Sequence, residues 1–292
     1  VGDTDSFGYL ITATNAKTDL TINPTPNDVH VGEKSVYVYS AAPQSLGGKI
    51  INHSNIVMDK NNGYGIYSSQ DSENYGDINL TSGVGNIGVY STQGMGRNHG
   101  TITVGPSNVT NKEYGIGMAT GYYDDNPASP TYGQTSNQGT IENYGTIEVS
   151  QPNSIGMYAV GTGSKAVNYN TIDLSGDNTI GMYIDRGATG ENWGTIKTTV
   201  NGLKSVKGIY VANGSYVKNY GTIAISATDL KSAGIWTDSS SYPNVEDTAT
   251  GLNPLPGGTN QTGTSTPALK VVTPDDMKEM GGTTIKVPPR MT

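Results

Sequence analysis

The chain has 292 residues, with 17 Lys and Arg against 25 Asp and Glu, so its formal net charge is −8 at pH 7. This acidic balance argues against a nucleic-acid backbone as a partner. Cysteine is absent, which excludes disulfides and thiolate chemistry, and no apolar run approaches the roughly 18 residues of a membrane helix. No signal peptide is visible at Val1, so we expect a piece of a longer exported protein.

Two short phrases alternate along the chain. The first is Asn-aromatic-Gly-Thr-Ile-x-Val, clearest at 143–149, and its copies begin at Asn52, Asn74, Asn98, Asn143, Asn168, Asn192 and Asn219. The second is apolar-Gly-apolar-Tyr, and its copies centre on Gly65, Gly88, Gly117, Gly156, Gly181, Gly208 and Gly234. From Asn to Asn, five of the six steps are 22–27 residues long and one is 45 residues long. A repeat of this length indicates a solenoid.

The alternation of apolar residues within each phrase predicts short strands. Ile147 and Val149 should face one side of a strand and Thr146 and Glu148 the other. In the second phrase, at 87–90, the two apolar residues should share a face and the Tyr should take the opposite one. Coils of roughly 24 residues without a helical pattern suit an all-β, right-handed parallel β-helix of about 7–9 coils. Equivalent strands would then pair about 4.8 Å apart.

The chain divides into three predicted regions. Residues 1–51 are irregular N-terminal coils or a cap, because solenoids need atypical units at their ends. Residues 52–240 form the regular β-helix. Residues 241–292 lose the period and begin with a loop rich in Pro, Gly and Thr. In this last region, 268–272 and 283–287 are predicted strands of a small β extension on the side of the rod, and 275–280 holds a turn or two of helix at most.

An insertion accounts for the doubled step between Asn98 and Asn143. It adds about 20 residues, chiefly 119–136, and insertions in repeat proteins form loops on one face that is often the binding face. Rings that stack and carboxylates that accept hydrogen bonds suit sugars or a cationic group of a partner. We therefore predict a binding role for Tyr122, Tyr123, Asp124, Asp125 and Tyr132. The alternative is a tolerated surface loop without a specific role.

Two columns of rings recur with the coils. One follows the repeated Asn and consists of His53, Tyr75, His99, Tyr144, Tyr169, Trp193 and Tyr220. The other closes the second phrase, with Ala119 as the exception, and consists of Tyr67, Tyr90, Tyr158, Tyr183, Tyr210 and Trp236. We favour rings that stabilise and cover a sheet over a carbohydrate-stacking surface. The Asn column likewise predicts a ladder of side chains bonded to the backbone and to each other.

Signals for catalysis and for metal binding are weak. A β-helix enzyme that cleaves polysaccharides needs carboxylates about 5–10 Å apart on one sheet face. The acids are instead scattered mainly over predicted turns, at Asp71, Glu73, Asp124, Asp125, Glu142, Asp173, Asp185 and Glu191. His53 and His99 stand two coils apart, roughly 10 Å, which is too far to share a metal. We therefore expect no enzymatic activity, no metal and no cofactor.

The coils written Asn-Tyr-Gly-Thr-Ile-x-Val, at 143–149, and Ile-Gly-Met-Tyr, at 155–158 and 180–183, resemble the passenger domains of type V autotransporter adhesins. The resemblance covers roughly residues 52–240, and it is strongest to the large fusobacterial outer-membrane adhesins of the RadD kind. It implies an extracellular passenger and virulence factor of a Gram-negative bacterium, held at the outer membrane by a C-terminal membrane barrel outside this chain. The resemblance supplies no binding motif at the level of residues.

We therefore expect a segment of a bacterial surface adhesin passenger that mediates attachment between cells or to a host. Its partner would be a surface protein or glycan, not a nucleic acid, and the segment would be a monomer. Two alternatives stay open. One is a structural stalk that displays a binding tip located elsewhere in the full protein, and the other is a polysaccharide-active β-helix enzyme.

Overall fold

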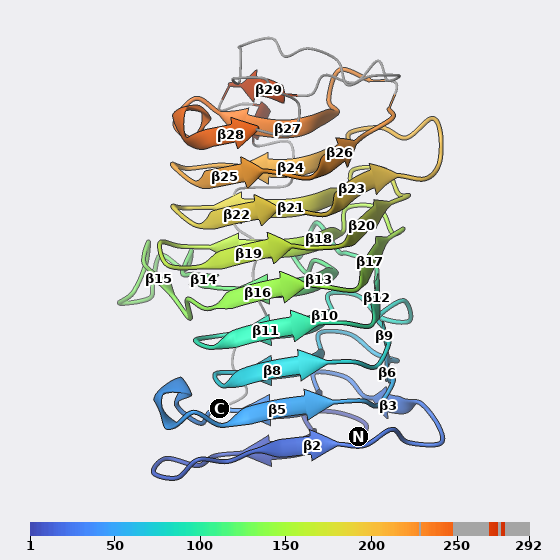
Figure 1. Ribbon diagram of the computed structural model, residues 1–292, viewed down its shortest axis with the longest axis vertical. Coiled ribbons are helices and arrows are strands. Elements are labelled where there is room, and N and C mark those ends of the chain that lie inside the picture. The colour runs from blue at the N-terminus through green and yellow to red at the C-terminus, as the bar shows by residue number, and fades with distance from the viewer. Residues whose placement is uncertain (228, 248–268, 274–275, 278–292) are drawn as a thin grey trace.

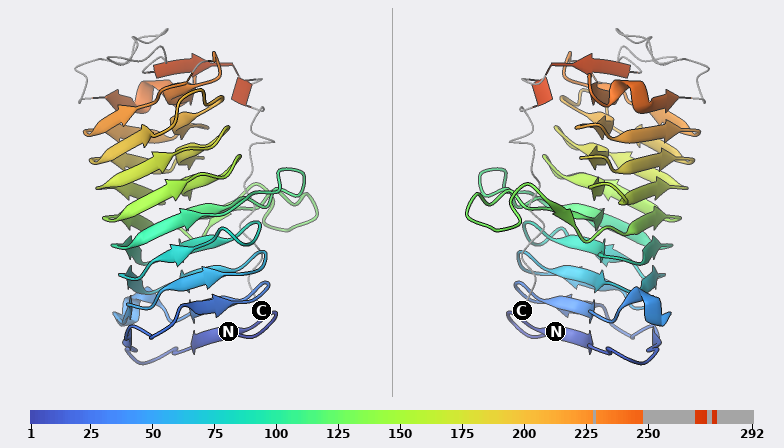
Figure 2. Two further views of the ribbon diagram at one scale, coloured as in Figure 1. Left: turned by 90° about the vertical axis from the view of Figure 1, so that its right-hand side faces the viewer. Right: turned by 90° about the vertical axis from the view of Figure 1, so that its left-hand side faces the viewer.

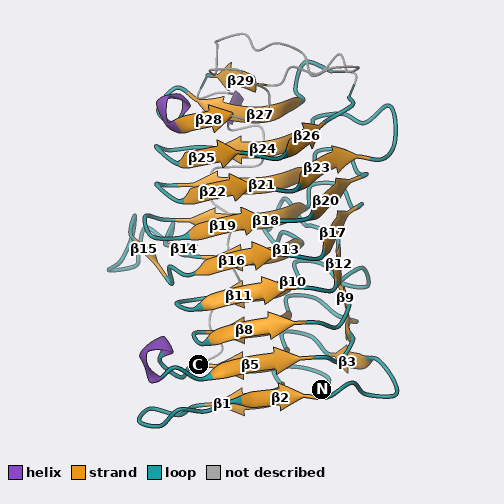
Figure 3. Ribbon diagram, in the orientation of Figure 1, coloured by secondary structure: helices purple, strands orange, loops and turns teal. Residues whose placement is uncertain are grey.

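The computed structural model describes residues 1–227, 229–247, 269–273 and 276–277. These residues form a parallel β-solenoid of about nine turns, in which each full coil gives one strand to each of three long sheets (Figure 1). The expected all-β parallel solenoid is confirmed, and its right-handed sense stays a prediction. Figure 3 shows the strands in orange on three sides of the rod, joined by turns in teal. The two short 3-10 turns are η1 (Gln44–Leu46) and η2 (Tyr242–Asn244).

Each sheet stacks equivalent strands of successive coils. The ten-stranded sheet contains β1 (Phe7–Ile11), β4 (Val36–Ser40), β7 (Tyr64–Ser68), β10 (Ile87–Ser91), β13 (Ile116–Thr120), β18 (Ile155–Val160), β21 (Ile180–Asp185), β24 (Lys207–Val211), β27 (Ala233–Asp238) and β29 (Leu269–Val272). The nine-stranded sheet contains β2 (Leu20–Ile22), β5 (Lys49–Asn52), β8 (Asp71–Asn74), β11 (Met95–Asn98), β16 (Thr140–Asn143), β19 (Lys165–Asn168), β22 (Thr189–Asn192), β25 (Tyr216–Asn219) and β28 (Val245–Asp247). The eight-stranded sheet contains β3 (Val29–Val31), β6 (Ile56–Met58), β9 (Ile78–Asn79), β12 (Thr101–Val104), β17 (Thr146–Val149), β20 (Thr171–Leu174), β23 (Thr195–Thr198) and β26 (Thr222–Ala224).

The two ends of the chain join this pattern as far as the structure describes them. Residues 1–51 supply strands that pair in parallel with those of the next coil, for example Leu20 with Ile50. At the other end β29 pairs in parallel with β27 and so lies at the end of the ten-stranded sheet. The expected strand at 283–287 lies outside the described residues, as does 275–280 except for Asp276 and Met277, which are helical.

The interior is a continuous stack of aliphatic side chains. In β17, Ile147 and Val149 are buried in it, whereas Glu148 is exposed and Thr146 is half-buried. This confirms the alternation predicted for the first phrase, and the same order recurs in β12 and β20. Each isoleucine sits above its equivalent one coil away, so the core is built from columns rather than from long-range packing of different elements.

The arrangement predicted for the second phrase is wrong. Val89 belongs to the interior cluster, but Ile87 packs with Tyr90 in a second cluster on the outer face of the ten-stranded sheet. Gly88 is the cause, because a Cβ built on it would point inward, 3.2 Å from Cγ2 of Ile102 and 2.6 Å from the carbonyl oxygen of Gly117. Two consecutive inward positions break the period of two, so the residues on both sides face outward.

A ladder of buried asparagines runs along one corner of the solenoid. The side-chain Nδ2 of each donates to Oδ1 of its equivalent in the next coil over 2.8–3.1 Å, through Asn52, Asn74, Asn98, Asn143, Asn168, Asn192 and Asn219. Each of the first six also donates to the carbonyl oxygen two residues further along its own coil. The predicted turn ladder is therefore confirmed. The Nδ2 of Asn219, the last asparagine of the ladder, donates to the Asp247 carboxylate at 3.0 Å. A carboxylate can end the ladder because it accepts hydrogen bonds and has no N–H of its own to satisfy.

Breaking the ladder in its middle should destabilise the whole rod. Asn143→Ala removes the bonds to Asn98 and Asn168, so one buried N–H of Asn98 and the buried Oδ1 of Asn168 lose the partner that Asn143 provides. We expect a loss of about 2–4 kcal/mol in the free energy of unfolding, measured by urea titration. The exposed Glu148→Ala in the neighbouring strand is the control and should change stability by less than about 0.5 kcal/mol. Equal effects of both variants would contradict a structural role for the ladder.

Candidate functional site

The insertion forms a hairpin that projects from the side of the rod without disturbing its register. Its two strands, β14 (Tyr122–Tyr123) and β15 (Thr135–Ser136), are antiparallel, and the hairpin stands out from the solenoid in both views of Figure 2. Asn98 still pairs with Asn143 across the insertion. The hairpin leaves the corner between the ten-stranded and the nine-stranded sheets, because it connects β13 to β16.

The acidic residues of the hairpin are engaged within the chain. The buried Asp124 carboxylate accepts hydrogen bonds from the Asn126 backbone N–H at 3.0 Å and from the Thr131 hydroxyl at 2.6 Å. Hydrogen bonds from the Ser129 and Thr131 hydroxyls hold the pKa of Asp124 below its usual value. Asp125 forms an ion pair with Lys112 at 3.4 Å. Asp124 therefore shapes the loop, while Asp125 ties it to the preceding coil.

The three tyrosines of the predicted site have different surroundings. Tyr122 is half-buried and packs against the outer cluster of the ten-stranded sheet. Tyr123 lies under the guanidinium of Arg186, whose Cζ is 3.7 Å from the centre of the ring. Tyr132 is 55% exposed. The five predicted residues thus do not form one cluster, and their binding role stays a prediction.

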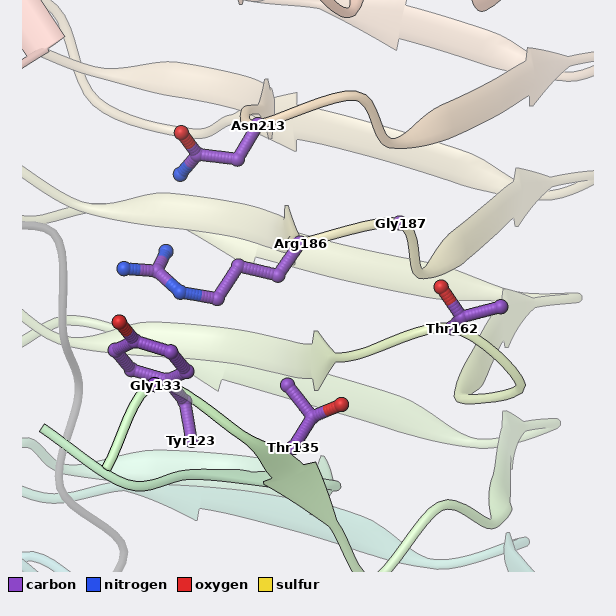
Figure 4. A pocket seen from close by; sticks show the side chains of 7 residues that line it. All are labelled: Tyr123, Gly133, Thr135, Thr162, Arg186, Gly187 and Asn213. Carbon is purple, nitrogen blue, oxygen red and sulfur yellow. The ribbon is translucent and has the colours of Figure 1, made fainter. Parts of the chain in front are cut away.

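The hairpin and the coil turns beside it line an open cleft of about 560 Å3. Figure 4 shows the cleft, with the Arg186 side chain extending over Tyr123. The lining comes from both hairpin strands and from three successive coil turns, and consists of Tyr123, Gly133, Thr135, Thr162, Arg186, Gly187 and Asn213. Of these residues, only Tyr123 belongs to the site predicted from the sequence.

Arg186 is held by a buried carboxylate. Its Nη1 donates to Oδ2 of Asp185 at 2.7 Å, and the Asn213 amide donates to Oδ1 of the same group at 2.7 Å. Asp185 is only 1% exposed, and this burial raises its pKa to about 6 even though Arg186 and Asn213 oppose the shift. Burial would also lower the pKa of Arg186, but Asp185 and Tyr123 raise it above its usual value, so the guanidinium is charged.

One signal in the sequence could have revealed Arg186. Continuing the strand register places Gly161, Arg186 and Asn213 at one position of three successive turns. All three have a left-handed backbone, with φ of 93°, 51° and 53°. Gly and Asn adopt this conformation readily and Arg rarely does. An arginine in a column of turn formers is therefore an exception to the repeat.

The exposed aromatic column has little ring face to offer a sugar. Five pairs of its rings stack with centroids 4.0–5.2 Å apart and interplanar angles of 5–21°. Tyr75, Tyr144, Tyr169 and Trp193 are 38–49% exposed, but stacking covers most faces and leaves mainly edges to solvent. A sugar that stacks needs a free ring face, so this geometry favours the stabilising role.

The acids beside this column are satisfied by neighbouring side chains. Tyr75, Tyr144 and Trp193 each donate to the Glu two positions before them, over 2.6–3.1 Å. Cations complete the pattern, because Lys49, Arg97 and Lys165 form ion pairs with Glu73, Glu142 and Glu191, respectively. Burial would raise the pKa of Glu73, but hydrogen bonds from Lys49 and Tyr75 lower it to about 2. This face of the nine-stranded sheet is a network of internal pairs.

Within the described residues, no group of three or more His, Asp and Glu is placed to hold a metal ion. The part of the chain that the structure describes also contains no helix long and apolar enough to cross a membrane.

Because the pKa of Asp185 is raised, the free energy of unfolding should depend on pH. The folded carboxyl keeps its proton up to a pH of about 6, whereas the unfolded one loses it near its ordinary pKa of 3.8. Its contribution to stability is therefore complete below pH 4 and declines as the pH rises through 6. Relative to Asp185→Asn, the wild type should lose on the order of 2 kcal/mol between pH 4 and pH 7, measured by urea unfolding. A difference that does not vary with pH would contradict the raised pKa.

The comparisons with known proteins place this solenoid in a family. The family model of the BigA third pectate lyase-like domain matches residues 8–194. The match runs from β1 to the end of β22 and includes both the hairpin and Arg186. Searches of curated proteins and of solved structures gave no match. Because the family model covers well over half of the sequence, the chain belongs to the BigA third pectate lyase-like domain family.

Proposed function

We propose that the chain is a segment of a bacterial surface adhesin passenger that mediates attachment to other bacteria or to host cells. Its membership of the BigA third pectate lyase-like domain family is the observation that carries this proposal, because such a domain fits a surface passenger. The partner is a surface protein or a glycan, and binding, not catalysis, is the activity. Secretion by the type V route and a specificity like that of the RadD adhesins are the finer parts of the proposal.

The projecting hairpin is the part of the domain that we assign to adhesion. On the nine-stranded sheet, asparagines bond asparagines, most rings of the exposed column stack on rings, and Glu73, Glu142 and Glu191 bond cations and aromatic donors. The hairpin departs from this pattern, since it carries Tyr132 with more than half of its surface exposed. An exposed ring on a projecting loop is a common anchor in protein interfaces.

The stalk alternative is favoured by one specific observation. Asp124 and Asp125, which are part of the predicted site, are occupied by hydrogen bonds or an ion pair inside the chain. A hairpin stabilised in this way can be a folded loop without a binding role, on a stalk whose binding tip lies elsewhere in the full protein. The adhesin and the stalk differ in whether the isolated domain adheres to cells.

Adhesion should depend on the hairpin tip. In one variant, residues 125–132 are replaced by Asn-Gly, a turn that favours a two-residue hairpin, so that Asp124 and Gly133 keep their backbone hydrogen bond. Beads coated with the wild-type domain should attach to bacterial and host cells, and the variant should reduce attachment by at least about tenfold. Tyr132→Ala alone should reduce it by about threefold to tenfold, the loss of roughly 1 kcal/mol expected for an exposed anchor.

The matched control is Tyr216→Ala, because Tyr216 is 50% exposed but lies on β25, outside the hairpin. It should leave attachment unchanged, and all variants should keep the thermal midpoint of the wild type within a few degrees. If the hairpin variant adheres as well as the wild type, the hairpin is not the site. If wild-type beads do not adhere to any cell type, the stalk alternative replaces the adhesin.

A further inference from the structure

The cleft beside the hairpin contains a cation, Arg186, whose backbone is strained. The scaffold turns the chain at this corner with Gly161 in one coil and Asn213 in another, both suited to a left-handed backbone. Arg186 adopts the same conformation with φ of 51°, at a cost that Gly would avoid. Strained residues of this kind cluster at binding sites, so an observed outlier is a reason to look for a ligand.

The guanidinium of Arg186 is fixed in position and has donors to spare. Stacking on Tyr123 at 3.7 Å and the bond from Nη1 to Asp185 at 2.7 Å set the plane of the group. A guanidinium has five N–H donors, and this side chain is 18% exposed at the cleft. A rigid fork of donors recognises a carboxylate through two parallel hydrogen bonds, which a lysine cannot reproduce.

The rest of the lining is neutral and polar. The Thr135 and Thr162 side chains and the Asn213 amide line the same cleft as the arginine (Figure 4). None of the seven lining residues is acidic, and the Asp185 carboxylate lies buried behind Arg186. Hydroxyls and amides that can donate and accept suit the hydroxyl groups of a sugar. The volume of about 560 Å3 falls within the range of small-molecule sites.

We propose that this cleft binds a glycan unit that carries a carboxylate, such as a uronic or a sialic acid. The carboxylate pairs with the Arg186 guanidinium, and the sugar hydroxyls bond Thr135, Thr162 and Asn213. The site is distinct from the exposed tip of the hairpin. The inference deepens the proposed adhesive function, on which it rests, by naming the class of glycan that one part of the domain recognises.

Binding of acidic and neutral sugars tests the proposal directly. The wild-type domain is titrated calorimetrically with sialyllactose and with an oligosaccharide of glucuronic acid, and lactose serves as the neutral counterpart. We expect the acidic sugars to bind at least about tenfold more tightly than lactose. Arg186→Gln should bring their affinity down to that of lactose, and Thr162→Val should weaken binding by a smaller factor of about threefold.

Arg97→Gln is the matched control, because Arg97 is also ion-paired but lies on the nine-stranded sheet, away from the cleft. It should leave the affinities unchanged. Where Arg186→Gln destabilises the fold by leaving Asp185 alone, Arg186→Lys retains a cation and should still lose most of the preference for acidic sugars.

Equal affinity for acidic and neutral sugars, or an unchanged preference in Arg186→Lys, would overturn the proposal. Binding of an acidic peptide in place of every sugar would overturn it too, since the cleft would then recognise protein carboxylates. These outcomes leave the adhesion of coated beads untouched, so the adhesive function stands or falls separately. Beads that fail to adhere although the domain prefers acidic sugars would reject the adhesive function alone.

Discussion

The hydrogen bond from one buried asparagine to the next is the interaction on which the rest of this rod depends. Strands of neighbouring coils must lie about 4.8 Å apart, and the corner that joins two sheets must repeat with the same spacing. An asparagine meets both needs because its amide donates and its carbonyl accepts, so each of these residues satisfies the next. A buried polar group without a partner costs free energy. Any slip in register between two coils would therefore break a bond such as that from Asn98 to Asn143 and leave one N–H and one carbonyl oxygen without this partner.

The spacing of about 4.8 Å between coils also determines which side chains on the faces of the rod are left to contact a partner. Once like residues are stacked, rings cover rings, as in Tyr144 on Tyr169, and charges of opposite sign pair, as in Arg97 and Glu142. A surface made in this way has few unsatisfied groups to offer to a partner. We therefore expect recognition where the stacking is broken, and the hairpin and the turn that contains Arg186 are two such places among the described residues.

Much of the fold could be predicted because the repeat is local. The spacing of the asparagines predicts the coil, and the alternation around Ile147 predicts its inward face. Alternation gave the wrong arrangement for the second phrase, because it assumes that successive residues face opposite sides of the strand. Gly88 has no side chain, so it can face inward next to the inward-facing Val89.

The site was harder to predict. Tyr123 and Arg186 are far apart in sequence, and only the return of the chain through the intervening coils brings the ring under the guanidinium. The role of Asp124 inside the hairpin turn could not be predicted either, since the sequence shows its charge but not its partners.

The hairpin and the turn that contains Arg186 are also neighbours in space. An insertion in one coil would be accommodated by folding back on itself, and the Asp124 turn shows that this hairpin does so. The hairpin also bends toward the following coils, where Tyr123 and Thr135 meet Thr162 and Arg186. The coil that supplies Arg186 departs from the repeat as well. It has an arginine in a left-handed turn where the neighbouring coils have Gly161 and Asn213, and a buried carboxylate where they have Val160 and Ala212. Two irregularities that each carry a cost, and that together line one polar cleft, are better explained by a shared ligand than by two separate losses of regularity.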